Sequence, residues 1–331
     1  MARRATFVNK QRADLGRILL IDGGGFFHRA GTDWWRESVT AWRELERLGY
    51  DAVTLGELEA NQWSLTDSLL QLGTTLPLVT TNIERRGGDD WQPVGSRCRV
   101  VEIDGVRVGF LSALIEGRAV ASLAERTGGA VRVLPALETV REVARLLKGV
   151  AAGPTRAPRA IGKAEAMRLA RESADILILI GYLDNPIMQT LADSIPEIDV
   201  ILGGIHQPRD AGPLRMGHAI IQRAGDRGGA VAVTDLVVSP VNEIVEFGGR
   251  AALLDEGWPE DPQVAAVVAV ATEATKRDVA AKQERMQQER MERFRQLQAR
   301  QQRAGGGEPA DSARSAPGDS LPPIPPQDPP R

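Results

Sequence analysis

The sequence predicts an α/β fold, and three observations support this prediction. Apolar segments of strand length alternate with amphipathic segments of helix length through most of the chain. Residues 176–180 are apolar without interruption, which is typical of strands buried on both faces of a parallel sheet. Glycine-rich turns follow predicted strands at residues 23–25 and 203–204, and α/β folds gather their functional sites at such strand ends.

The first half of the chain contains the clearest individual elements. Residues 35–48 carry apolar side chains three and four positions apart, which predicts an amphipathic helix that ends at Gly49. Asp104 and Gly105 separate two apolar segments and predict a β-hairpin. Strands are predicted here over residues 18–21, 52–55, 76–79, 99–103 and 106–111, and a second helix over residues 65–72.

The second half continues the alternation of helices and strands. A helix is predicted over residues 134–148, with Pro135 in the first turn, and another over residues 163–173. The segment between them, residues 149–162, is rich in Gly, Ala, Pro and Arg and predicts a mobile insertion. Further strands are predicted over residues 176–180, 199–202, 219–222 and 230–238.

The carboxyl-terminal part of the chain has a different composition. Residues 262–303 contain no Gly or Pro after Pro262, which predicts one long helix. Its second half carries a thin apolar stripe formed by Met286, Met291, Phe294 and Leu297. Eight of the 20 prolines follow residue 303, which predicts a disordered tail. We therefore expect an α/β domain over residues 1–250, a helical extension over 251–303 and a Pro-rich tail over 304–331.

Composition excludes several classes of protein. The formal net charge of −3 gives no general attraction to nucleic acid, so we expect no nucleic-acid partner. No apolar run is long enough to span a membrane, and the basic amino terminus lacks the apolar core of a signal peptide. The single cysteine, Cys98, excludes an intrachain disulfide, and it is expected on a strand rather than as a reactive thiol.

Seven short blocks, in order along residues 2–240, resemble segments of one protein family. The block at residues 49–59 reads GYDAVTLGELE and is similar to the family segment GYDAVTLGNHE, and the block at 198–207 reads IDVILGGIHQ and is similar to IDVIIGGHSH. The others are the Arg3-Arg4-Ala5-Thr6 segment, DGGGFF at 22–27, LPLVTTNI at 76–83, GVRVGFL at 105–111 and ADILILIGYL at 174–183. The chain thereby resembles the catalytic domain of the 5′-nucleotidase-type calcineurin-like metallophosphoesterases.

This resemblance implies a fold and a chemistry. The fold is a four-layered α/β/β/α sandwich. The chemistry is the hydrolysis of phosphate esters by two divalent metal ions, which Asp, Asn and His side chains hold on loops that follow the strands. Such ions at a phosphate require carboxylate, amide and imidazole ligands, and an aliphatic side chain cannot replace them.

The sequence departs from the family pattern at each site position that the matched blocks contain. The bridging aspartate falls on Gly25 and the asparagine ligand on Glu57. The histidine that helps to stabilise the phosphate falls on Leu58, beside the retained Glu59. The remaining three histidines fall on Tyr182, Ile205 and Gln207, whereas His206 stands one place away.

Two further parts of the family pattern are not found in the sequence. The first motif, Asp-x-His, should precede Ala2, so we expect an upstream start that could also carry an export signal; localisation therefore stays open. The second domain, which stacks the nucleoside base in 5′-nucleotidases, has no counterpart after residue 250, so nucleoside specificity is not supported.

Two functional hypotheses follow, from different classes. In the first, the protein is a catalytically inactive pseudoenzyme that binds or scaffolds, has no cofactor, and meets a protein partner through the helix at residues 262–303. In the second, it is a weak metal-dependent phosphoric ester hydrolase. That alternative needs a divalent metal pair held by a rearranged set drawn from Asp22, Glu57, Glu59 and His206, with Asp184 nearby. A non-functional gene fragment is a third reading, and it predicts poor solubility.

Overall fold

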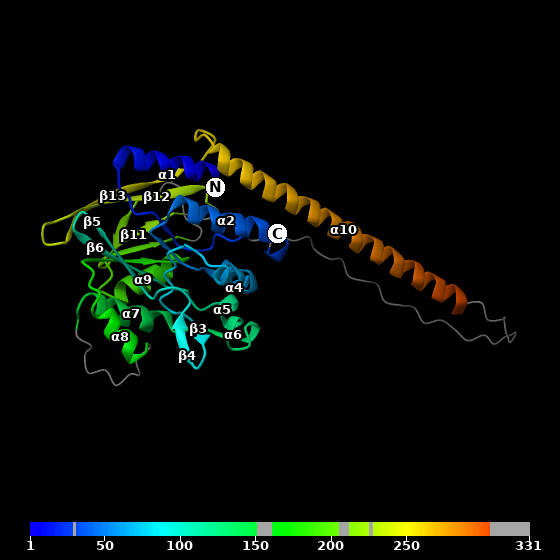
Figure 1. The fold of residues 1–331 in the computed structure, drawn as a ribbon, viewed down its shortest axis with the longest axis horizontal. Coiled ribbons are helices and arrows are strands. Elements are labelled where there is room, and N and C mark those ends of the chain that lie inside the picture. The colour runs from blue at the N-terminus through cyan, green and yellow to red at the C-terminus, as the bar shows by residue number, and fades with distance from the viewer. Residues whose placement is uncertain (29–30, 151–160, 205–211, 225–227, 305–331) are drawn as a thin grey trace, which may run out of the picture. The chain divides into compact units, whose positions relative to one another are not determined.

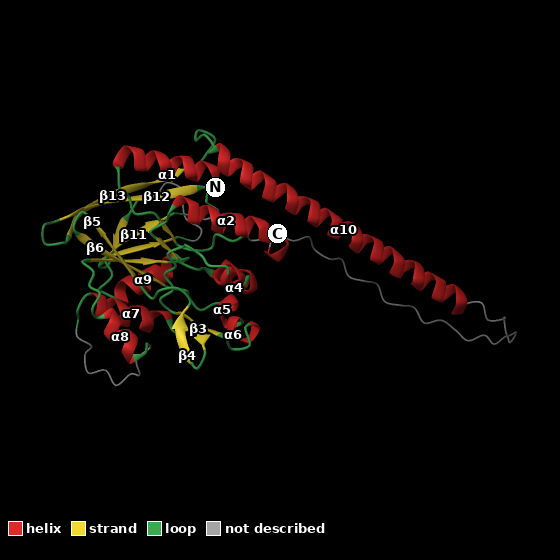
Figure 2. Cartoon of the chain, viewed as in Figure 1, coloured by secondary structure: helices red, strands yellow, loops and turns green. Residues whose placement is uncertain are grey.

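The computed structural model describes residues 1–28, 31–150, 161–204, 212–224 and 228–304, and it has the four-layered α/β/β/α architecture. Two β-layers pack face to face, and helices cover the outer face of each (Figures 1 and 2). The expected fold class is therefore confirmed.

A six-stranded sheet forms the first β-layer. Its order is β10-β11-β9-β8-β6-β5, in which the four inner strands are parallel and the two edge strands are antiparallel to their neighbours. The strands are β5 (Arg99–Ile103), β6 (Val106–Ser112), β8 (Ile176–Ile180), β9 (Val200–Gly203), β10 (Leu214–Met216) and β11 (Ala219–Arg223).

The central strand β8 shows why this sequence requires two covered faces. Successive side chains of a strand point to opposite faces of the sheet. Leu177 and Leu179 enter the core shared with the helices, whereas Ile176, Ile178 and Ile180 enter the core shared with the second β-layer. Because all five side chains are buried, neither face can be left to solvent.

The second β-layer consists of two strand pairs. Strands β1 (Ile21–Asp22) and β2 (Ala52–Val53) are parallel, and Val53 forms a further parallel bridge to Leu78. Strands β12 (Ala230–Val238) and β13 (Ile244–Leu253) form an antiparallel hairpin. Leu19, Ile21, Leu236 and Phe247 of this layer pack against the buried face of the six-stranded sheet, so both pairs belong to the same sandwich.

Helices cover both outer faces. On one side, α1 (Ala2–Leu15), α2 (Trp35–Leu48) and α4 (Trp63–Gln71) pack on the β1–β2 and β12–β13 pairs around the fully buried Trp42. On the other side, α7 (Ala136–Leu147), α8 (Lys163–Leu169) and α9 (Asn185–Ser194) pack on the six-stranded sheet. The helices on each side therefore bury their apolar faces against the sheet that they cover.

A small antiparallel sheet, in the order β4-β3-β7, is attached to the sandwich. Its strands are β3 (Ile83–Gly87), β4 (Asp90–Pro93) and β7 (Val131–Val133). The remaining short helices of the described residues are η1 (Gly31–Trp34), α3 (Glu57–Asn61), α5 (Arg118–Ala121) and α6 (Leu123–Arg126).

A buried ion cluster includes Glu84 of the small sheet. Its central guanidinium, that of Arg97, is 1% exposed and contacts Glu84 and, at 2.7 Å, Glu165. Arg132 binds the other oxygen of Glu84 at 2.6 Å. This cluster ties the small sheet to α8.

Local sequence signals correctly predicted several elements. Helix α2 ends at Gly49 in the left-handed conformation, and the β5–β6 turn places Asp104 and Gly105 at positive φ, as its hairpin sequence requires. Residues 76–79 form bridges to both neighbours but no regular strand. The expected insertion at residues 149–162 lies mostly outside the described residues.

The helix predicted after Pro262 is present as α10 (Pro262–Ala304). The first compact unit of the chain runs from Met1 to Arg277 and includes the start of this helix, where Val264 is buried and Thr275 donates a hydrogen bond to Glu37 at 2.8 Å. The division at residue 250 stays a prediction, and the expected tail at 304–331 lies almost wholly outside the described residues. Within the described residues, no helix is long and apolar enough to cross a membrane.

The buried ion cluster generates one prediction about stability. Glu84→Gln removes the carboxylate that Arg97 and Arg132 share, and it leaves the buried guanidinium with a single anionic partner. Breaking a buried pair in this way should lower the free energy of unfolding by about 3 kcal/mol. Urea unfolding measures the loss, and the exposed Glu102→Gln on β5 is the matched control, with an expected change below about 0.5 kcal/mol. Equal effects of the two substitutions would contradict this account of the cluster.

Cys98 generates a second prediction. Its thiol is buried, 3.6 Å from a carboxylate oxygen of Glu172, and burial together with that negative charge raises the pKa of Cys98 to about 12. At pH 8 only about one thiol in 10⁴ is then ionised in the folded protein, and the thiolate is the reactive species. We expect an aromatic disulfide reagent to label Cys98 at least 100-fold more slowly in the native state than in guanidinium. Native labelling within tenfold of the unfolded rate would show that the thiol is accessible.

Candidate functional site

Four loops meet where parallel strands of both β-layers end. Gly23–Gly25 follows β1 and Thr54–Gly56 follows β2, while Gly181 follows β8 and Gly204 follows β9. The two layers touch here, because a Cβ atom added to Gly23 would lie 3.1 Å from the carbonyl oxygen of Gly181. This is the end of the sheets at which an α/β fold places its functional groups.

The loops after β1 and β2 pack backbone against backbone. A Cβ atom on Gly24 would lie 2.6 Å from the nitrogen of Gly56, and one on Gly56 would lie 2.6 Å from the nitrogen of Gly25. No side chain fits between them, so glycine is required at both positions for steric reasons.

Glu59 holds these two loops together. One oxygen of its carboxylate accepts hydrogen bonds from the N–H groups of Gly25 and Gly56, both at 2.8 Å, and the other accepts one from Phe27, also at 2.8 Å. The side chain is completely buried in helix α3, and burial raises its pKa even though the three backbone donors favour the charged form. Glu59, which the sequence named as a residual site candidate, therefore binds protein backbone.

Tyr182 lies directly against Gly25. The nearest ring carbon would be 3.0 Å from a Cβ atom on Gly25, whose φ of +74° also disfavours any other residue. The sequence resemblance aligns these two positions with a bridging aspartate and a histidine of the family. The aromatic ring of Tyr182 thus fills space that an aspartate side chain at residue 25 would enter.

Asp22, at the end of β1, has partners within the protein as well. Its carboxylate lies 3.3 Å from the guanidinium of Arg4 on α1, accepts a hydrogen bond from Gly24 at 3.0 Å, and is 14% exposed. Arg4 also donates to the hydroxyl of Tyr50 at 3.4 Å. Burial raises the pKa of Asp22, and the neighbouring positive charge opposes that rise. The carboxylate is oriented toward α1 by these contacts.

The other candidate residues are placed individually. Glu57 is exposed in the first turn of α3, and Leu58 is half-buried against the core cluster that contains Trp42. Asp184 caps α9 by accepting a hydrogen bond from the N–H of Ile187 at 3.0 Å. Ile205, His206 and Gln207 lie outside the described residues. Within the described residues, no three His, Cys, Asp or Glu side chains are grouped as a metal ion would need.

Two residues that hold Asp22 in place were not identified from the sequence. Arg4 and Tyr50 anchor Asp22, and each stands in a block that carries the family resemblance, but nothing in those blocks indicates that the side chains meet. The clamp made by Glu59 was also missed, although a glutamate three residues after Gly56 is the spacing of a capping box.

Comparison with known proteins places this geometry in context. No family model matches the sequence. A snake venom 5′-nucleotidase from Gloydius brevicauda is 24% identical over 277 residues, which cover 81% of this chain and 45% of the relative. The chain thus spans about half the length of that curated relative.

Solved structures agree on the fold. The calcineurin-like phosphoesterase YfkN from Bacillus subtilis superposes with a TM-score of 0.61 at 17% identity, over 85% of this chain and 90% of that one. A 5′-nucleotidase precursor from Thermus thermophilus gives a TM-score of 0.59 at 18% identity, over 85% of this chain and 53% of that one. The resemblance found in the sequence blocks is therefore confirmed at the level of the fold.

The contact between Gly25 and Tyr182 can be tested against a matched glycine. Gly88, in the β3–β4 turn, has a similar φ of +68° but no atom within 4 Å of an added Cβ. Gly88→Ala should cost about 1 kcal/mol of unfolding free energy, from backbone strain alone. Gly25→Ala should cost about 1–2 kcal/mol more because the Tyr182 ring must move.

Chemical denaturation of both variants measures this difference. In a Tyr182→Ala background, the extra cost at Gly25 should disappear while the cost at Gly88 persists. If the two glycine substitutions destabilise the protein equally in both backgrounds, Tyr182 does not fill this space.

Proposed function

From the fold of the 5′-nucleotidase-type metallophosphoesterases, which this chain has, we propose a protein that no longer hydrolyses phosphate esters and acts by binding. The observation that carries the proposal is the occupation of the loop junction by Tyr182 and Glu59. Catalysis in this fold requires two metal ions with open coordination positions. Here an aromatic ring lies against Gly25, and the buried carboxylate binds three backbone N–H groups.

The side chains at the family's ligand positions also support an inactive protein. Gly25, Leu58 and Tyr182 supply no carboxylate, amide or imidazole at three positions where the family has them. Asp22 would have to leave Arg4 before it could bind a cation, and the guanidinium beside it would repel that cation. The described side chains therefore do not fit a dinuclear metal centre, and we derive no reaction step through one.

A weak metal-dependent phosphoric ester hydrolase is the second candidate, because Glu57 is exposed and offers a carboxylate at the position of the family's asparagine. That function requires Glu57 to act together with His206, and Asp22 or Glu59 to exchange protein partners for a metal. The alternative is distinguished by metal retention that depends on Glu57.

A binding role needs a surface for a partner, and helix α10 offers one. Met286, Met291, Phe294 and Leu297 are each more than half exposed in the part of the helix that follows Arg277. Large apolar side chains in such a row are typical of helices that pack against another chain. We propose that this stripe is where a protein partner binds.

Elemental analysis and a turnover assay test the proposal. The purified protein is soaked with manganese, zinc and iron salts, desalted, and assayed on a generic aryl phosphate. We expect less than about 0.1 metal equivalents retained and no hydrolysis above buffer, because the described residues do not group three His, Cys, Asp or Glu side chains that could bind such an ion tightly.

Two equivalents of metal retained together with hydrolysis would overturn the proposal. Glu57→Gln would then locate the site, because the alternative predicts that this variant loses both metal and activity. Glu102→Gln, which removes an exposed carboxylate from β5, is the matched control and should change neither measurement.

A further inference from the structure

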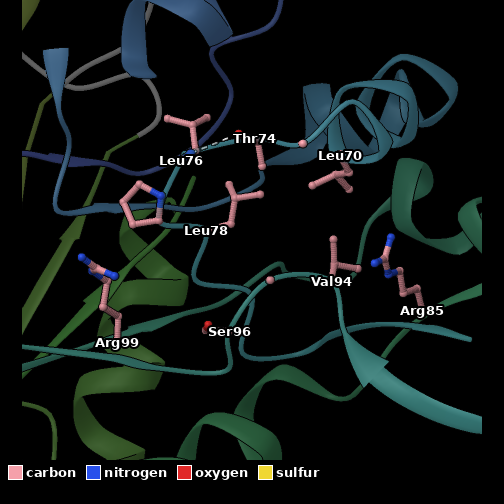
Figure 3. Close-up of a pocket in the computed structure, with 11 residues that line it drawn as sticks. Leu70, Thr74, Leu76, Leu78, Arg85, Val94, Ser96 and Arg99 are labelled. Atoms are coloured by element: carbon pink, nitrogen blue, oxygen red, sulfur yellow. Dashed lines mark hydrogen bonds between the residues drawn. The ribbon is translucent and has the colours of Figure 1, made fainter. Parts of the chain in front are cut away.

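A cavity of about 310 Å³ opens beside residues 76–78, away from the loop junction (Figure 3). Residues 76–78 run parallel to β2, and the cavity lies toward their start, whereas the glycine loops follow the other end of β2. The side chains of Leu70, Leu76, Leu78 and Val94 line one part of it, and Thr74, Ser96 and two arginines line another, so apolar and polar groups meet in it. This volume is within the range of small-molecule sites.

Two arginines flank the apolar lining. Arg85 comes from β3 and Arg99 from the start of β5, and in Figure 3 the side chains of Leu78 and Val94 lie between them. Both side chains are exposed, and neither guanidinium makes a hydrogen bond or ion pair with any described residue. Arg97 and Arg132, which belong to the same part of the fold, both bind Glu84. The two cations at the cavity are thus available to a ligand.

No acidic side chain in the cavity lining neutralises the two arginines. The lining contains Arg85 and Arg99 but no Asp or Glu. A second cavity, of about 450 Å³, shows the contrast, because its lining mixes Lys148 and Arg215 with Asp175, Asp199 and Glu243, and Lys148 lies 2.8 Å from Asp199. Of these two cavities, the first has positive charge that no lining residue neutralises, and the second does not.

We propose that this cavity binds a small organic dianion, specifically a linear dicarboxylate with an apolar chain. A guanidinium binds a carboxylate through two parallel N–H donors. A ligand with a carboxylate at each end can engage Arg85 and Arg99 at once while its methylene chain lies over Leu78 and Val94. Ser96, whose hydroxyl makes no hydrogen bond with described residues, lies between the arginines in the view of Figure 3 and can donate to one carboxylate. This site is separate from the loop junction, so it stands whether or not the protein hydrolyses phosphate esters.

NMR titration of the full chain tests the proposal, with the amide signals of Gly95 and Ser96 as reporters. The probes are succinate, adipate and suberate, with hexanoate and inorganic phosphate as comparisons, all at 0.15 M salt to limit unspecific attraction. We expect affinity to depend on chain length among the dicarboxylates, and the best of them to bind at least fivefold more tightly than hexanoate or phosphate.

The variants Arg85→Gln and Arg99→Gln should each weaken the best dicarboxylate at least fivefold. Arg86→Gln, the neighbour of Arg85 whose side chain points to the other face of β3, is the matched control and should stay within twofold. Thermal unfolding of all three verifies that they are folded. The proposal is overturned if no dicarboxylate binds at 20 mM, if phosphate binds as well as the best dicarboxylate, or if all three variants bind alike.

Discussion

The carboxylate of Glu59 accepts three hydrogen bonds from the backbone of two loops, and the arrangement of the loop junction depends on them. Gly25 and Phe27 belong to the loop after β1, and Gly56 belongs to the loop after β2. With these donors satisfied by one buried anion, the two backbones approach until no side chain fits between Gly24 and Gly56. A buried charge is tolerated only where donors surround it, so the clamp and the close approach stabilise each other.

The sandwich is stabilised by contacts that lie outside the loop junction. The two β-layers are held by apolar side chains that alternate between cores, as in β8, and by the helices on either side. None of these contacts involves a metal ligand. Three carboxylates near the junction have protein partners: Asp22 binds Arg4, Asp184 caps α9, and Glu59 binds the two loops. Substitution at the loop ends therefore leaves the sandwich itself intact.

Surfaces away from the junction are consistent with a protein that acts by binding. The apolar stripe on α10 and the arginine-flanked cavity beside residues 76–78 would bind their ligands through different interactions. The first offers exposed apolar area, and the second offers uncompensated positive charge beside a few apolar side chains. They lie in different compact units of the chain, since α10 beyond Arg277 belongs to the second unit.

The sequence by itself determined the fold class, β8, the β5–β6 hairpin, helix α2 with its glycine stop, and the long carboxyl-terminal helix, because each depends on local periodicity or turn chemistry. It also predicted, from the resemblance, that the family's site positions fall on Gly25, Glu57, Leu58 and Tyr182. Only the tertiary structure decided what those positions do. Helix α1 was not predicted because its buried residues, Ala2, Ala5, Phe7 and Val8, form no long stripe, and it is held by packing on the sheet. Strand β13 contains Gly248 and Gly249, which disfavour a strand locally, and pairing with β12 overrides them. The contacts of Tyr182 with Gly25 and of Asp22 with Arg4 join residues far apart in the chain, and no local pattern encodes such a meeting.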